Sequence, residues 1–179
     1  MLHYIMNMLV SYPKPEFKSL TDSAIKNLAI NFANEIDYKP KKDLIPIIEE
    51  KLNGKVEFVD DEMLQNSNDG SIIVHGPKNI QIFLTKYNGP LRDRFTLAHE
   101  LGHYVIHSEK GKFPLMAERL GNSGAEWEAN MFAAELLMPE SEFRAAMNVS
   151  LDNQFLAANF LVSLTAAHVR KEILIKRKK

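Results

Sequence analysis

The sequence predicts an α+β fold, in which a small antiparallel or mixed sheet packs on helices and a C-terminal helical extension resembles a helix-turn-helix. Three observations support this fold class. Two amphipathic helical patterns precede residue 54, three short runs of β-branched and aromatic residues lie between residues 55 and 85, and helical periodicity dominates from residue 93 onwards. The strands are therefore confined to one stretch between two helical regions.

Composition and length fit one ordinary core. The 179 residues are 45% hydrophobic and 25% charged, so we expect a domain over residues 1–139 with an extension, residues 140–179, packed on it. Cysteine is absent, which excludes disulfides and thiolate catalysis and leaves histidine and carboxylate as metal ligands. A net charge of -1 gives no general attraction to nucleic acid. Residues 1–10 lack the features of a secretion signal and no stretch is long enough to span a membrane, so we expect a cytoplasmic protein.

Two helices are predicted before the strands. The first can be capped by Thr21 or Asp22 and ends before Pro40. Its apolar face consists of Ile25, Leu28, Ala29, Phe32, Ala33 and Ile36. The second begins at Asp43 and ends at Asn53-Gly54, which suits a left-handed helix end. Both helices are expected to be structural.

Three strands are predicted next, over Lys55–Val59, Ser71–His75 and Ile80–Thr85. The turn residues Gly76-Pro77-Lys78-Asn79 separate the second run from the third. Together the runs predict a small sheet that precedes the most informative helix of the chain.

That helix is predicted over residues 93–107 and contains the run His99-Glu100-Leu101-Gly102-His103. Histidines four residues apart lie on one helical face, where both can bind the same metal ion, and this pair suits zinc. Glu100 lies about 100° further around the helix, which places it better as a general base than as a ligand. Composition alone predicts about 0.02 such runs in this chain. The alternative is a core helix with two incidental histidines.

A catalytic zinc also needs a third protein ligand. His107 lies about 12 Å along the helix axis from His99, so these two cannot share an ion with His103. We expect His107 to support a ligand or to lie at the helix end. Tyr104 and His107 are both candidates for a group that steadies the oxyanion of a reacting carbonyl, although no spacing assigns that role.

The third ligand is expected on a helix over Ser123–Pro139, which Ser123 can cap and Pro139 ends. Glu126 and Asn130 share its core-facing stripe. A carboxylate on such a stripe needs a partner, and a metal ion would be one. We therefore favour Glu126 over Glu128 as the ligand and expect Asn130 to orient a ligand by a hydrogen bond. Glu128 and Glu135 are read as solvated charges.

The segment between these two helices, residues 108–124, carries several glycines and a proline, so a flexible loop is predicted there. It is either a gate over a cleft or a plain connection. Its apolar residues Phe113, Leu115 and Met116 either pack on the domain or meet a substrate.

Three further helices are predicted over residues 140–147, 152–160 and 164–175, the last capped by Ser163 or Thr165. The lengths of the last two suit a helix-turn-helix, and Arg170 and Lys171 are the residues that would contact DNA. DNA contact through residues 152–179 is the less favoured possibility, because no basic face is evident. In the alternative, Val162, Leu164, Ala167 and Ile173 dock on the core.

The run 94–107, followed by Glu126-x-x-Ala129-Asn130-x-Phe132-Ala133-Ala134-x-Leu136-Leu137-Met138-Pro139, resembles the ImmA/IrrE metallopeptidase family of bacteria and their phages and mobile elements. The resemblance is strong over residues 90–140 and extends in element order from about residue 20 to 175. It implies a zincin-like fold with His99, His103 and Glu126 as the ligands of one zinc ion and Glu100 as the catalytic glutamate.

The resemblance also implies a substrate. Family members typically cut a helix-turn-helix repressor encoded nearby, which releases stress or mobile-element genes, so we expect a repressor or antitoxin as partner. In such a peptidase an edge strand holds the substrate backbone by strand addition, and Ile80, Ile82 and Leu84 of the last predicted strand are our substrate-binding candidates. A plain hairpin is the equally weighted alternative.

Three classes of function remain at this point. The first is a zinc endopeptidase, in which Glu100 takes a proton from a water activated by the metal and passes it to the leaving amine. The second is a DNA-binding regulator with a structural zinc, and the third is a module that sequesters a repressor without cutting it. Glu100 favours the first, because a structural site needs no base beside its ligands. The oligomeric state has no signal in the sequence.

Overall fold

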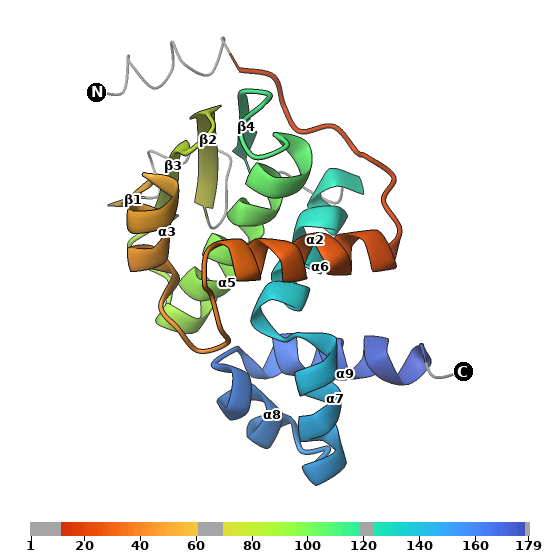
Figure 1. Cartoon of the computed structure of the whole chain (residues 1–179). Coiled ribbons are helices and arrows are strands. Elements are labelled where there is room, and N and C mark those ends of the chain that lie inside the picture. The colour runs from red at the N-terminus through yellow and green to blue at the C-terminus, as the bar shows by residue number, and fades with distance from the viewer. Residues whose placement is uncertain (1–11, 61–69, 119–123, 178–179) are drawn as a thin grey trace.

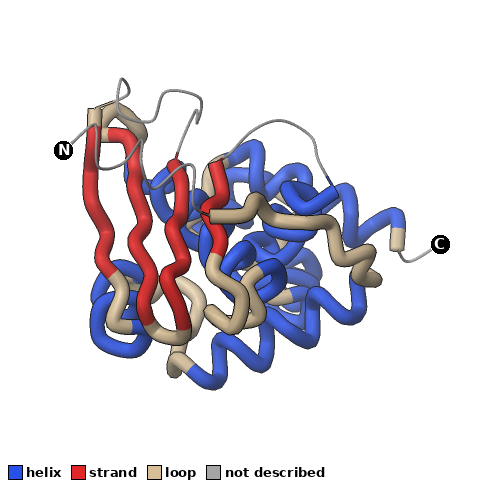
Figure 2. The backbone as a smooth tube through the Cα atoms, turned by 90° about the horizontal axis from the view of Figure 1, so that it is seen from above, coloured by secondary structure: helices blue, strands red, loops and turns tan. Residues whose placement is uncertain are grey.

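The structure is a computed structural model, and it describes residues 12–60, 70–118 and 124–177. These residues form seven α-helices, one π-helical turn and a four-stranded mixed sheet (Figure 1). In Figure 2 the four strands lie side by side and the helices gather on one side of them. The α+β expectation is confirmed.

The two N-terminal helices begin and end where their caps predict. Helix α2 (Asp22–Glu35) begins after Thr21, whose hydroxyl accepts a hydrogen bond from the Ala24 N–H at 3.2 Å. Helix α3 (Leu44–Leu52) begins after Asp43 in the same way and ends at Asn53, which has a φ of 46°. Their apolar faces enter the main core, which also contains one face of the sheet.

The sheet has the order β1-β3-β2-β4, formed by β1 (Lys55–Val59), β2 (Gly70–Gly76), β3 (Asn79–Thr85) and β4 (Leu115–Glu118). Strands β2 and β3 form an antiparallel hairpin, β1 pairs in parallel with β3, and β4 pairs antiparallel with β2. Strand β3 is therefore interior.

The position of β3 overturns the prediction that it is an edge strand for substrate. Both of its sides are paired, and Ile80, Ile82 and Leu84 are only 2%, 0% and 0% exposed because they point into the core under the helices. The prediction was wrong because it took the last strand in sequence for the outermost one. Strand β1 pairs with the side of β3 that faces away from β2, so β1 is the edge strand on that side of the sheet.

Strand β4 lies within residues 108–124, where a loop was predicted. It pairs Leu115 with Val74 and Ala117 with Ile72, and its three apolar residues, Leu115, Met116 and Ala117, are buried. Four residues are too few to show a strand period, and pairing with β2 is what makes the segment extended. Among the described residues, β1 and β4 are the sheet edges.

Helix α5 (Pro90–Gly102) continues into the π-helical turn η1 (His103–His107), and α6 (Gly124–Leu137) packs across α5. The predicted α-helix over residues 93–107 is thus π-helical in its last turn, where the Ser108 N–H donates to the His103 carbonyl at 3.0 Å. Ser123, the predicted cap of α6, lies outside the described residues.

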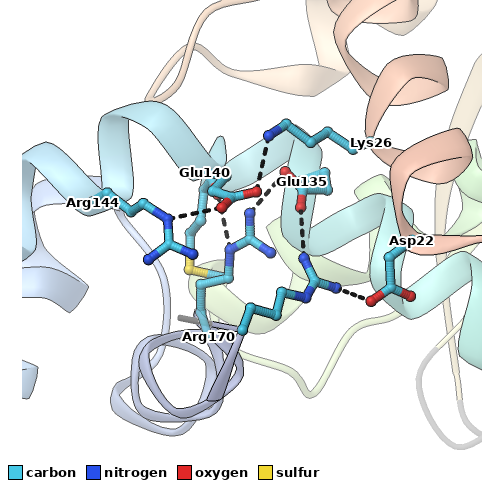
Figure 3. Close-up of polar contacts among 8 residues, drawn as sticks. Asp22, Lys26, Glu135, Glu140, Arg144 and Arg170 are labelled. Atoms are coloured by element: carbon cyan, nitrogen blue, oxygen red, sulfur yellow. Dashed lines mark hydrogen bonds and ion pairs between the residues drawn. The ribbon is translucent and has the colours of Figure 1, made fainter. Parts of the chain in front are cut away.

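Helices α7 (Glu140–Val149), α8 (Asn153–Phe160) and α9 (Leu164–Lys176) follow close to their predicted bounds. Arg170 of α9 is 1% exposed and its guanidinium lies 2.7 Å from the Glu135 carboxylate of α6 (Figure 3). Burial lowers the pKa of Arg170, and the Glu135 carboxylate opposes that shift. Arg170 therefore joins α9 to α6 and is not available to DNA. The sequence ends in the basic run Lys176-Arg177-Lys178-Lys179, of which Lys178 and Lys179 lie outside the described residues.

None of the described helices combines the length and the apolar character that crossing a membrane requires.

Candidate metal centre

Three potential ligand atoms converge between α5, η1 and α6. The Nε2 atoms of His99 and His103 lie 3.2 Å apart, and each lies 3.2 Å from one oxygen of the Glu126 carboxylate. The three residues are 0%, 1% and 5% exposed. Ligand atoms about 2.0–2.1 Å from an ion at tetrahedral angles are separated by about 3.3 Å. The spacing and the chemistry of this group therefore fit a metal ion.

The local sequence explains this convergence. His99 and His103 are four residues apart and point from the same side of the helix, with ring centroids 4.9 Å apart. Gly102 lets α6 approach, since a Cβ atom at that position would lie 3.0 Å from the Ala129 Cα. Glu126 is less than one turn from Ala129 and so reaches the two imidazoles.

Electrostatics favour a cation here. Burial raises the pKa of Glu126, but hydrogen bonds from His103 and His99 outweigh burial and lower this pKa to about 2. The carboxylate is therefore ionised at neutral pH beside two imidazole nitrogens. A carboxylate oxygen and two imidazole nitrogens form a typical donor set for a divalent transition metal.

Each of the two candidate histidine ligands has a partner on its other nitrogen. His99 Nδ1 lies 3.0 Å from the Asn130 amide oxygen, and His103 Nδ1 lies 3.1 Å from His107 Nδ1. An amide oxygen only accepts, so His99 carries a proton on Nδ1, and Nε2 is the nitrogen that would bind an ion. The structure thus brings Asn130 and His107 to the ligands but does not make His107 one of them.

His107 is held by a carboxylate that was predicted to be solvated. Its Nε2 lies 3.1 Å from Glu128, which is 0% exposed. Burial and the neighbouring His103 lower the pKa of His107 to about 4, so this imidazole is neutral at pH 7. Glu135, also predicted to be solvated, is 3% exposed and pairs with Arg170.

The sequence carried a signal for the burial of these two glutamates. Helix α6 has apolar residues on every side: Ala125, Ala129, Met131, Phe132, Ala133, Leu136 and Leu137. A helix that is apolar all round is buried all round, and α2 and α5 both pack on this one. The prediction considered only the stripe of Glu126 and Asn130. Because the whole helix is buried, every carboxylate on α6 needs a partner.

Glu100 and Tyr104 lie on the same helical segment but have different surroundings. Glu100 is 1% exposed and directly follows His99, one of the candidate ligands. The Tyr104 hydroxyl accepts a hydrogen bond from the Lys78 N–H at 3.3 Å, and its ring packs edge-on against Phe32. Burial raises the pKa of Tyr104. The Tyr104 side chain thus contacts the β2–β3 turn and the core.

Comparison with known proteins supports a peptidase. A model of the peptidase family described as IrrE N-terminal-like domain matches residues 56–172, more than half of the 179-residue chain. The matched region contains the three converging residues and Glu100. A search of curated proteins found no significant match. On the family match, this chain belongs to the ImmA/IrrE family of metallopeptidases.

Proposed function

We propose that the protein is a zinc-dependent endopeptidase that hydrolyses a peptide bond in a protein substrate. The convergence of His99, His103 and Glu126 within 4.8 Å of one another, beside a buried Glu100, carries this proposal. Family membership supports the reaction class. Zinc is the metal that two histidines and one carboxylate typically bind in catalytic sites, where three protein ligands leave a position open.

Each residue of the site then has a chemical role. His99, His103 and Glu126 hold the ion, and Asn130 fixes the ring of His99. Zinc, when bound, acidifies water and polarises a peptide carbonyl. Glu100 accepts the proton of the attacking water and delivers it to the leaving amine.

The proposed substrate is a helix-turn-helix repressor or antitoxin encoded near this gene, and the proposed setting is the cytoplasm. The resemblance of residues 90–140 to the ImmA/IrrE family supports this choice. The burial of Arg170 removes one of the two side chains on which the alternative, direct DNA binding, depended.

The test is the intact mass of that regulator after incubation with the zinc-loaded protein and, separately, with its Glu100→Gln variant. We expect two fragments with the wild type, and a rate at least about 100-fold lower with the variant, because a general base contributes about 10²- to 10⁴-fold. The variant should still bind zinc. If the wild type and the variant produced the fragments at equal rates, Glu100 would not be the general base. An uncut regulator that co-purifies would favour sequestration instead.

A further inference from the structure

A chain of buried side chains joins the candidate ligand His103 to the backbone near the N-terminus. His103 contacts His107 at 3.1 Å, and His107 contacts Glu128 at 3.1 Å. The Glu128 carboxylate accepts hydrogen bonds from the N–H groups of Lys18 at 3.0 Å and Leu20 at 2.8 Å. The side chains of His107 and Glu128 are both 0% exposed, so water does not compete for these contacts.

Metal binding by His103 would determine which atom donates and which accepts in each of these hydrogen bonds. An imidazole that binds an ion through Nε2 carries its proton on Nδ1. His103 Nδ1–H then donates to His107 Nδ1, which leaves the His107 proton on Nε2, where it donates to Glu128. A carboxylate only accepts, and here it ends the chain as an anion with three donors.

The backbone over residues 18–20 is shaped to receive that anion. Ser19 has a φ of 57°, the left-handed conformation, and its neighbours' N–H groups point at the two oxygens of one carboxylate. A left-handed residue between them turns the N–H groups of Lys18 and Leu20 to one side, as in an anion-binding nest. The segment runs from the side of β4, where Pro13 accepts from the Met116 N–H at 3.1 Å, to the start of α2 (Figure 1).

We propose that His107 and Glu128 are positioning residues for the metal ligand His103, and that the nest at residues 18–20 sets their positions. This inference rests on the proposed metal site. Glu128 holds the proton of His107 on Nε2, which leaves the His107 Nδ1 lone pair to orient the His103 ring and strengthen it as a donor. Supporting carboxylates of this kind commonly change metal affinity by about 10- to 100-fold.

The competing explanation is a purely structural one, in which the network only fastens the N-terminal segment to α6. The two explanations differ in what a defect changes. A structural role lowers the stability of the fold and leaves the intrinsic metal affinity and ligand geometry alone. If the residues position His103, a defect changes both the metal affinity and the ligand geometry.

The first experiment measures zinc affinity by competition with a chromogenic chelator, together with the absorption spectrum of the Co²⁺-loaded protein, for the full chain and its Glu128→Gln variant. We expect affinity to fall about 10- to 100-fold and the Co²⁺ bands to shift. Glutamine has one accepting oxygen instead of two and carries no charge, so it cannot accept from His107, Lys18 and Leu20 together. Glu135→Gln is the matched control, since Glu135 is also a buried carboxylate of α6 but pairs with Arg170. It should lower stability and leave affinity and spectrum unchanged.

The second experiment tests the nest through Ser19, whose side chain is exposed. Ser19→Val disfavours the left-handed conformation and Ser19→Gly permits it, so only the valine variant should weaken zinc binding, by several-fold. Equal affinities for these two variants would remove the nest from the proposal. Wild-type affinity and spectrum in Glu128→Gln would overturn the positioning role. If the wild type itself bound no zinc, or His99→Ala bound it equally well, the metal site would fail instead.

Discussion

His99 and His103 are equivalent in sequence spacing but are supported differently. His99 meets a neutral amide, Asn130, whereas His103 meets a second imidazole that leads to a buried carboxylate. A carboxylate makes the connected imidazoles more basic than an amide does, so the two candidate ligands should differ in donor strength. Residue identity at the ligand positions is thus only part of what defines the site.

The third ligand can be tested by comparing the two glutamates at the start of α6. Glu126→Ala removes a carboxylate whose two oxygens each lie 3.2 Å from one of the imidazole nitrogens, so zinc affinity should fall by more than the roughly 10- to 100-fold expected for Glu128. Equilibrium dialysis against buffered zinc measures both. A larger loss on changing Glu128 would move the ligand to that position.

At the scale of elements, the site depends on how closely α5 and α6 approach. Gly102→Ala would place a methyl group 3.0 Å from the Ala129 Cα, so we expect a destabilisation of about 1–3 kcal/mol and weaker zinc binding as the helices separate. Urea unfolding and chelator competition measure the two effects. Gly89→Ala is the control, because a Cβ there would meet nothing within 4 Å. Unchanged stability in Gly102→Ala would show that α5 and α6 can move apart without a loss in the free energy of unfolding.

The ion pairs of Glu140 connect α7 to α2 (Figure 3). Its carboxylate accepts from Lys26 at 2.9 Å and Arg144 at 2.8 Å, and these bonds lower the pKa of Glu140 to about 2. A lowered folded-state pKa contributes stability above the unfolded value of 4.5, and this contribution is lost as the pH falls towards 2. Glu140→Gln should therefore cost about 0.5–1 kcal/mol at pH 7 and almost nothing near pH 2. Denaturant unfolding at both pH values checks this, and a constant difference would contradict it.

Local interactions made much of the architecture predictable. The caps Thr21 and Asp43, the left-handed Asn53 and the four-residue spacing of His99 and His103 are all readable from neighbouring residues. Strand order cannot be read in this way. Neighbouring residues do not determine whether β1 pairs with β3 or with β2 of the hairpin.

The remaining part of the site depends on contacts between distant residues. Glu128 lies 108 positions from Leu20, whose N–H it accepts, and 21 positions from His107. No periodicity within α6 encodes those partners. The π-helical turn is likewise invisible in the apolar pattern of residues 93–107, which an α-helix would satisfy equally well.

At the scale of the whole molecule, a bound ion should stabilise the fold. The candidate ligands come from two helices, so only the folded chain brings the three atoms together. Zinc at about 100 times its dissociation constant should add about 2.7 kcal/mol, seen as a rise in the thermal unfolding midpoint. His99→Ala should abolish that rise, and an equal rise in this variant would place the zinc elsewhere.

The parallel pairing of β1 with β3 has a consequence for how the chain reaches this state. The β2–β3 hairpin forms from neighbouring residues, whereas β1 can pair only after β3 is in place. Helix α6 must also bring Glu126 to histidines that precede it by more than 20 residues. Contacts of large sequence separation form at a higher entropic cost and later. The ion site is therefore completed late in folding, so zinc should slow unfolding more than it accelerates refolding.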